Sequence, residues 1–183
     1  STEVYKEFLQ NGYLISGSLN YDPFNERARQ AYWAHLEEFM KMGIDGWWLD
    51  ASEPEFNKPV DETSDLGIWS FYTGLHDSST AMGPGAELVN AFPLMHTKAV
   101  YEGQRSVSNR RVVILTRSAF AGQQRNSAIT WSGDIHHDWG VLSGQVPAGL
   151  NFSASGIPYW TTDTGGFFSG NPSTPSYKQI FLR

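Results

Sequence analysis

The chain has 183 residues, no cysteine and a formal net charge of -6. This length is enough for one domain with a real core, and the acidic balance, with 13 Lys and Arg in total, argues against a nucleic-acid partner. No apolar run approaches the ~18 residues of a membrane span, and the first residues do not have the pattern of a signal peptide. The absence of cysteine excludes disulfides and thiol catalysis but does not fix the compartment.

Hydrophobic periodicity and turn residues predict alternating helices and strands. We expect a helix end, a loop and a turn over residues 1–25, and a long irregular loop over residues 51–83. In chain order, the expected elements are a helix over 28–40, a strand over 44–50, a helix from 84 to about 105, strands over 111–117 and 128–131, a helix over 139–155 broken at Pro147, a strand over 157–163 and a helix from 177. Pro93 should bend its helix or mark the first turn. Of Trp47 and Trp48, one should face the core and the other the rim, because side chains alternate along a strand.

Alternation of this kind favours a parallel α/β fold, either a (β/α)8 TIM barrel or a doubly wound sheet. The run over 111–117 is continuously apolar, as in a parallel strand that is buried on both faces. Four predicted strands lead into polar side chains, namely Asp50, Arg117, Asp134 and Asp163. In a barrel all four would lie at the carboxyl end of the strands, where such barrels keep their chemistry. No GxGxxG fingerprint follows a strand, which counts against a dinucleotide site.

Three carboxylates and one guanidinium group suit acid–base or nucleophilic carboxylate chemistry, of which glycoside cleavage is one case. One carboxylate must be ionised, and Arg117 could supply the nearby cation. The other must hold a proton, which an apolar surround such as Trp131 would favour. Spacing alone leaves structural roles open: Asp50 could cap the next loop, Arg117 could form a structural ion pair, and Asp134 and Asp163 could be turn residues.

Two other polar groups are expected to be structural. His136 and His137 are adjacent, so they should not point the same way, and no third ligand stands at helical spacing; we therefore expect no metal site. The acids after the first strand lack the spacing of a known calcium loop and are expected to form a solvated loop face. These acids are Glu53, Glu55, Asp61, Glu62 and Asp65.

Several segments resemble the motifs of glycoside hydrolase family 31. Residues 48–54 (WLDASEP) resemble the nucleophile signature. The segment 117–125 (RSAFAGQQR), running on to 131–134 (WSGD), resembles the signature that carries the acid/base. The segments 156–160 (GIPYW) and 163–167 (DTGGF) resemble the family's segment at the seventh barrel strand, and 21–25 (YDPFN) also fits the family pattern. The motifs occur in the family's order and together span nearly the whole chain.

The resemblance implies a retaining α-glycosidase that acts by double displacement on α-xylosides or α-glucosides at their non-reducing ends, without a cofactor. Position by position, it makes Asp50 the nucleophile and Asp134 the general acid/base. The residues that it places around the non-reducing-end sugar are Trp48, Arg117, Trp131, Asp163 and Phe167, with Arg117 and Asp163 bonded to sugar hydroxyls. The Met-Asn of many members is Ala51-Ser52 here, which resembles a bacterial xylosidase/glucosidase branch and does not fix the sugar.

By the family pattern, residues 1–183 correspond to the central part of a catalytic barrel, roughly strands four to seven, without the flanking strands and β-domains. Such barrels usually need ~250 residues. A partial barrel has two open strand edges. A second hypothesis is therefore an inactive barrel fragment that binds sugar weakly or self-associates, while its parent protein carries the activity. A third, an aldolase, is opposed by the lack of a lysine at a strand end.

Overall fold

The computed structural model describes residues 2–54 and 73–183. At its centre lies a four-stranded sheet in the order β1-β4-β5-β6, in which every neighbouring pair is parallel. The strands are β1 (Trp47–Leu49), β4 (Ile114–Thr116), β5 (Ala128–Trp131) and β6 (Trp160–Thr161). Each strand lies beside the next strand of the same sheet along the chain, with no reversal of order. This is the strand order of a (β/α) barrel and not of a doubly wound sheet.

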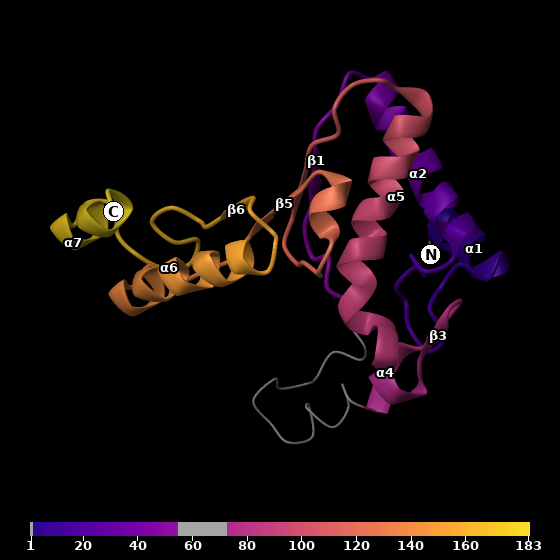
Figure 1. Cartoon of the computed structure of the whole chain (residues 1–183), viewed down its shortest axis with the longest axis horizontal. Coiled ribbons are helices and arrows are strands. Elements are labelled where there is room, and N and C mark those ends of the chain that lie inside the picture. Colours follow the sequence, from indigo (N-terminus) through magenta and orange to yellow (C-terminus); the bar gives the residue numbers. More distant parts are fainter. Residues whose placement is uncertain (1, 55–72) are drawn as a thin grey trace.

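Helices lie beside both edge strands of this sheet (Figure 1). They are α1 (Glu3–Gln10), α2 (Glu26–Lys41), α4 (Gly85–Leu88), α5 (Phe92–Val107), α6 (Trp139–Ala154) and α7 (Pro175–Phe181), with short 3-10 turns η1 (Val89–Ala91) and η2 (Gln123–Asn126). Helices α1, α2 and α5 lie on the side of β1, and α6 and α7 lie on the side of β6. A two-stranded antiparallel hairpin, β2 (Ser79–Thr80) with β3 (Gly83–Pro84), precedes α4. None of the described helices combines the length and the apolar character that crossing a membrane requires.

Local sequence explains where the longer helices begin. The Asn25 side chain accepts hydrogen bonds from the backbone N–H groups of Arg27 and Ala28, which caps α2. Asp138 caps α6 in the same way, accepting from the N–H groups of Gly140 and Val141. The caps place α2 directly after the 21–25 motif and α6 a short loop after the 131–134 motif.

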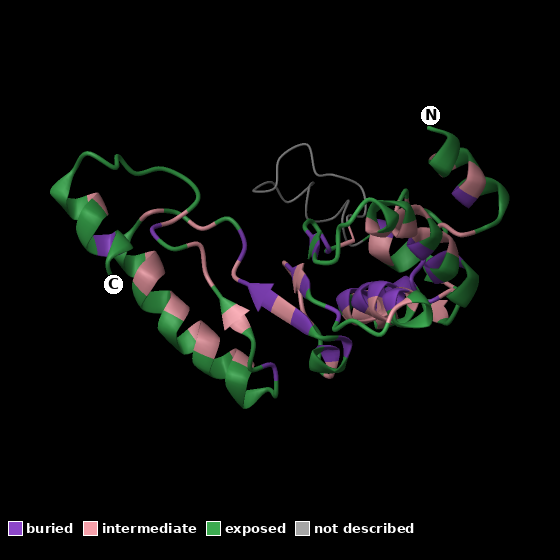
Figure 2. Cartoon of the chain, turned by 90° about the horizontal axis from the view of Figure 1, so that it is seen from above, coloured by how far each residue is buried: buried purple, intermediate pink, exposed green. Residues whose placement is uncertain are grey.

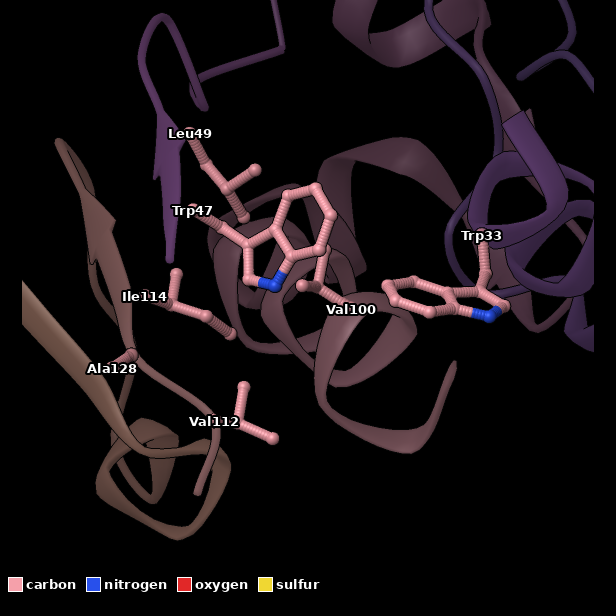
Figure 3. Packing of buried hydrophobic residues seen from close by; sticks show 7 residues of the cluster. All are labelled: Trp33, Trp47, Leu49, Val100, Val112, Ile114 and Ala128. Carbon is pink, nitrogen blue, oxygen red and sulfur yellow. The ribbon is translucent and has the colours of Figure 1, made fainter. Parts of the chain in front are cut away.

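The main core lies between the sheet and the pair of helices α2 and α5 (Figures 2 and 3). Its buried members are Trp33, Trp47, Leu49, Val100, Val112, Ile114 and Ala128. Trp33 and Trp47 meet edge to face, with ring centroids 5.5 Å apart. The Trp47 indole N–H donates to Oε1 of the fully buried Gln104 at 2.8 Å, so the polar atom of the ring is satisfied inside the core. This packing fixes the direction in which β1 runs, and with it the position of Asp50, which follows β1.

The predicted order of strands and helices is confirmed, but the strands are shorter than expected. The expected strand over 44–50 pairs only over Trp47–Leu49, and the one over 111–117 only over Ile114–Thr116, because ladder bonds form only where the neighbouring strand is also extended. The expected burial of the second strand on both faces is wrong. Ile114 and Thr116 are buried, whereas Leu115 is half-buried and Val113 is 49% exposed.

Helical segments differ from the expectation at three places. Residues 3–10 form a complete short helix. The helix expected from residue 84 is divided into α4, η1 and α5, and Pro93 lies in the first turn of α5, where its missing N–H needs no partner. The expected break at Pro147 is wrong: α6 continues through it, and the carbonyl group of the exposed Ser143, which Pro147 leaves without a helical donor, can bond to water.

The expected irregular loop over 51–83 also proves partly ordered. The hairpin of β2 and β3 lies within it, and Asp22 ties this hairpin to the N-terminal segment by accepting a hydrogen bond from the Ala81 N–H at 2.6 Å. Residues 55–72, with the acids Glu55, Asp61, Glu62 and Asp65, lie outside the described residues.

Candidate active site

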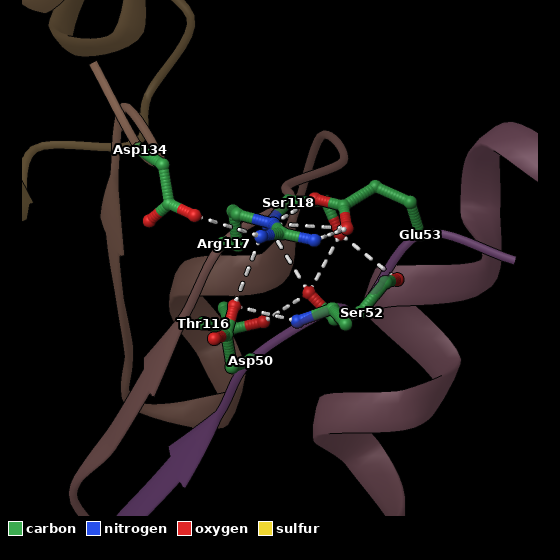
Figure 4. Close-up of polar contacts among 8 residues, drawn as sticks. Asp50, Ser52, Glu53, Thr116, Arg117, Ser118 and Asp134 are labelled. Carbon is green, nitrogen blue, oxygen red and sulfur yellow. Dashed lines mark hydrogen bonds and ion pairs between the residues drawn. The ribbon is translucent and has the colours of Figure 1, made fainter. Parts of the chain in front are cut away.

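The carboxyl ends of β1, β4 and β5 bring two acids and one arginine together (Figure 4). Asp50 directly follows β1, Arg117 directly follows β4, and Asp134 lies in the turn after β5. Nη1 of Arg117 lies 3.2 Å from Oδ1 of Asp50 and 3.9 Å from Oδ2 of Asp134. Since both carboxylates approach the same nitrogen atom, their nearest oxygens cannot be farther apart than the sum of these two distances. The structure therefore confirms that residues far apart in sequence meet at one strand-end edge of the sheet.

Glu53 occupies the other edge of the same guanidinium group. Its Oε2 accepts hydrogen bonds from Nε and Nη2 of Arg117, both at 3.1 Å, and Oε1 lies 3.3 Å from Nε. Glu53 is exposed, as a solvated loop face predicts, but it also forms this pair with Arg117, which that interpretation did not include. Spacing missed it because a carboxylate three residues beyond a strand usually faces water, although it lies inside the WLDASEP motif.

Three carboxylates thus surround one cation, and all four side chains are partly open to solvent: Arg117 is 28% exposed and Asp134 33%. The hydrogen bonds that Arg117 donates to Glu53, together with the negative charges of Glu53, Asp50 and Asp134, raise the pKa of Arg117, so the guanidinium group stays charged. Arg117 does form an ion pair, as the structural interpretation predicted, but that pair includes the predicted site acids. Its charge offsets the repulsion that the acids would otherwise exert on each other.

The loop between Asp50 and Glu53 is held by buried hydroxyl groups. Ser52 is 2% exposed, and its Oγ lies 2.8 Å from Oγ1 of Thr116 and 2.9 Å from Oγ of Ser118. The Ser118 N–H donates to the Ser52 Oγ at 3.1 Å. These bonds join the segment after β1 to the segment after β4.

Asp163 follows β6 at the same edge of the sheet. Burial, followed by the negative charges of Asp134 and Asp50, raises the pKa of Asp163. This coupling indicates that Asp163 shares the electrostatic environment of both acids, and no described ion pair with an arginine or lysine offsets it.

Aromatic side chains flank the charged group. Trp47 is buried and Trp48 is 68% exposed, so the predicted alternation is confirmed. The exposed Trp48 ring meets the buried Trp131 ring edge to face, with centroids 6.1 Å apart. Phe167 is 62% exposed, and its backbone N–H donates to the carbonyl of Ile135, which lies directly after Asp134. An exposed indole ring, with its apolar face and polar N–H, is typical of a binding surface.

The two adjacent histidines point to different partners, as expected. The His136 ring packs against Phe168, while His137 stacks on Tyr177 and its Nδ1 lies 2.6 Å from the Gly165 carbonyl oxygen. Within residues 2–54 and 73–183, no group of three or more histidines and acids is placed to hold a metal ion.

Comparison with known proteins identifies the fold family. The model of the glycosyl hydrolases family 31 TIM-barrel domain matches residues 1–183. The chain belongs to glycosyl hydrolase family 31. This family 31 chain is 57% identical over 182 residues to an α-xylosidase of Saccharolobus solfataricus, covering 100% of the chain and 24% of that protein. It is 30% identical over 183 residues to an α-glucosidase of the same organism, covering 92% of the chain and 26% of that protein.

A solved structure shows the same fold. The crystal structure of a family 31 α-xylosidase from a soil metagenome, complexed with xylose, superposes with a TM-score of 0.85 and 32% identity, covering 99% of this chain and 27% of the other. The family 31 chain therefore has a TIM-barrel fold, of which it spans the part with β1, β4, β5 and β6. It spans about a quarter of the length of these relatives.

Proposed function

We propose that this chain provides the nucleophile and the acid/base of a retaining α-glycosidase that releases α-linked xylose from the non-reducing end of its substrates. The observation that carries the proposal is the shared contact of Asp50 and Asp134 with one nitrogen atom of Arg117. That contact keeps the nearest oxygens of the two carboxylates no farther apart than the sum of the two distances, a limit that the separation in a retaining enzyme satisfies. Retaining enzymes hold their two carboxyl groups ~5–5.5 Å apart, whereas inverting enzymes leave ~6.5–9.5 Å for a water molecule.

In the proposed reaction, Asp50 attacks the anomeric carbon while Asp134 protonates the departing glycosidic oxygen. The bond to the leaving group breaks and a glycosyl ester forms on Asp50. The ionised Asp134 then takes a proton from a water molecule, the water oxygen displaces Asp50, and the sugar leaves with its original anomeric configuration. Asp50 must be ionised to attack, and its Oδ1 lies 3.2 Å from the charged guanidinium group of Arg117.

The remaining predicted residues have supporting roles in this proposal. Trp48, Trp131 and Phe167 would form the apolar walls of the sugar site, with Trp48 as the exposed ring on which a sugar face stacks. Arg117 and Asp163 would bond to sugar hydroxyls. Xylose is favoured over glucose because the relative that is 57% identical is an α-xylosidase, while the α-glucosidase relative is 30% identical.

The test uses the intact protein that contains this sequence, assayed with aryl α-xylosides and aryl α-glucosides. Asp50→Ala should abolish turnover. Asp134→Ala should lose most activity on substrates with poor leaving groups, and azide should restore part of it. Proton NMR of the first-formed sugar should show the α-anomer.

Asp45→Asn is the matched control, because Asp45 precedes β1 at the opposite end of the strand and pairs with Arg110 at 3.0 Å. This variant should retain wild-type turnover. Undiminished hydrolysis by Asp50→Ala, or a first-formed β-anomer, would remove the proposed mechanism.

A second candidate is an inactive barrel fragment that binds sugar weakly or self-associates. It is favoured by the sheet itself, in which β1 and β6 each have one strand neighbour among the described residues. Unpaired edges of this kind invite pairing with another chain. Mass measurement in solution with residues 1–183 alone, together with the aryl glycoside assay, separates the candidates: an oligomer without turnover supports the fragment, and a monomer with turnover supports the enzyme.

A further inference from the structure

We propose that Ser52, Thr116 and Ser118 form a hydroxyl clamp that positions the proposed nucleophile Asp50 relative to Arg117. The inference rests on the proposed function and adds three positioning residues to it. None of the three would touch the substrate. Their role would be to hold the segment after β1 and the segment after β4 in one register.

The clamp is a closed set of hydrogen bonds whose directions can be assigned. The Ser118 hydroxyl donates to the Ser52 carbonyl oxygen at 3.0 Å, so its only proton is used there. In the 2.9 Å contact between the two serine Oγ atoms, Ser52 must therefore be the donor. Thr116 then donates to the Ser52 Oγ across 2.8 Å, and the Ser118 N–H donates to the same atom at 3.1 Å. The Ser52 hydroxyl thus donates one bond and accepts two, which is its full capacity.

Two of the three hydroxyl groups are closed off from solvent: Ser52 is 2% exposed and Thr116 is fully buried, while Ser118 is half-buried. A buried polar group that loses its partner cannot turn to water, so the bond between Ser52 and Thr116 is hard to replace. The clamp therefore acts as a rigid connection and not as an exchangeable surface contact.

The position of the clamp in the chain links it to the chemistry. Ser52 lies between Asp50 and Glu53, and the other two hydroxyls belong to the residues on either side of Arg117. The chain turns between the nucleophile and the clamp at Ala51, whose φ of +47° is unfavourable for a residue with a side chain. Such a conformation persists only where the surrounding contacts hold it, and Ser52 makes those contacts on its C-terminal side.

The test again uses the intact protein and compares four variants. Thr116→Val removes one hydroxyl and keeps the side-chain shape, Thr116→Ser keeps the hydroxyl, and Ser52→Ala removes the centre of the clamp. Thr97→Val is the matched control: Thr97 is also a fully buried threonine, its hydroxyl bonds to Pro93 and Asn126, and it lies on α5 away from the strand ends.

We expect Thr116→Val and Ser52→Ala to lower kcat on an aryl α-xyloside by at least about tenfold, because small misplacements of reacting groups are costly. The inhibition constant of free xylose should change less than about threefold, since ground-state binding does not depend on the line of attack. Thr116→Ser should recover most of the lost kcat. Thr97→Val should lower the melting temperature as much as Thr116→Val and leave kcat unchanged.

A kcat within about twofold of wild type in Thr116→Val, while Asp50→Ala is inactive, would overturn the clamp and leave the proposed function standing. Equal loss of kcat in Thr97→Val and Thr116→Val would also overturn it, because lost stability would then explain both. If Ser52→Ala fails to fold, the pair of Thr116 variants decides alone. If Asp50→Ala stays active, the proposed function itself fails.

Discussion

Glu53 and Arg117 face each other edge to edge: the Nε and Nη2 groups of the guanidinium donate to one carboxylate, and Nη1 is left between Asp50 and Asp134. A planar guanidinium held along one edge cannot rotate, so its remaining nitrogen keeps a fixed direction. Glu53 also neutralises much of the charge of Arg117. Both effects can be separated by substitution.

Glu53→Gln should lower kcat on an aryl α-xyloside by about tenfold. The neutral amide keeps the shape of the side chain but replaces the charge-assisted hydrogen bonds that orient the guanidinium group of Arg117 with weaker ones. The measurement is a series of initial rates at saturating substrate.

Glu53→Asp is the control for this substitution. It keeps the charge but shortens the reach to Arg117, so kcat should fall in this variant as well. An unchanged kcat in Glu53→Gln would show that the pair with Glu53 does not orient Arg117 for the reaction.

Trp48→Ala should raise KM for an aryl α-xyloside about tenfold, which corresponds to ~1.4 kcal/mol of lost binding. Because Trp48 is 68% exposed, its removal should change the free energy of unfolding by less than about 0.5 kcal/mol. Trp48→Phe retains a stacking ring and should recover part of the affinity. Steady-state kinetics and urea unfolding give both numbers, and an unchanged KM in Trp48→Ala would exclude Trp48 from the sugar site.

His96 should make stability fall as the pH drops from 6.5 to 4. Burial lowers the pKa of His96 to about 4. Its ring packs against Tyr21, Tyr32 and Phe92, and the Tyr21 hydroxyl lies 2.6 Å from its Nδ1. Between these two pH values the unfolded chain takes up a proton that the folded chain does not, so the free energy of unfolding rises with pH across this window. Above pH 6.5 the contribution of His96 no longer changes with pH. The free energy of unfolding should differ by about 3 kcal/mol between the two ends of the window.

Urea unfolding at pH 7, 5.5 and 4.5 measures this effect. His96→Gln should be less stable than wild type at pH 7 and should lose less stability on acidification. Gly103→Ala is the control, since it perturbs the same core without removing a titratable group, and it should keep the wild-type pH dependence. An identical pH dependence in His96→Gln and wild type would show that other groups cause the acid instability.

Gly103→Ala should destabilise the packing of α2 on α5. A Cβ atom at residue 103 would lie 2.1 Å from the buried Trp33 ring and 2.8 Å from the Trp33 Cβ, so turning the ring alone would not relieve the overlap. Overpacking of this kind costs about 1–3 kcal/mol. Gly144→Ala is the control: residue 144 lies in α6, a Cβ atom there would have nothing within 4 Å, and alanine should be neutral or stabilising by up to about 1 kcal/mol. Thermal melting of both variants checks the prediction.

The parts of the fold that the sequence predicted depend on short-range patterns. The apolar run before Asp50 and the run before Arg117 are local signals, and the strands that they indicate are present. The lengths of the strands were not predictable in the same way. Pairing depends on how far a neighbouring strand stays extended, and the neighbour lies elsewhere in the sequence.

The residues at the strand ends could be named from the chain because each parallel strand places its last residues at the same edge, so Asp50, Arg117 and Asp134 follow from alternation and motif. What only the tertiary structure decided is which atoms meet. Glu53 and Ser52 belong to a polar loop whose sequence is equally compatible with full solvation. They become an ion pair and a buried hydroxyl bond because the parallel register brings Leu49 beside Thr116, and so sets the loop after β1 against the loop after β4. Ion pairs and hydrogen bonds depend on the distances between atoms in space, whereas a sequence gives only the separation of residues along the chain.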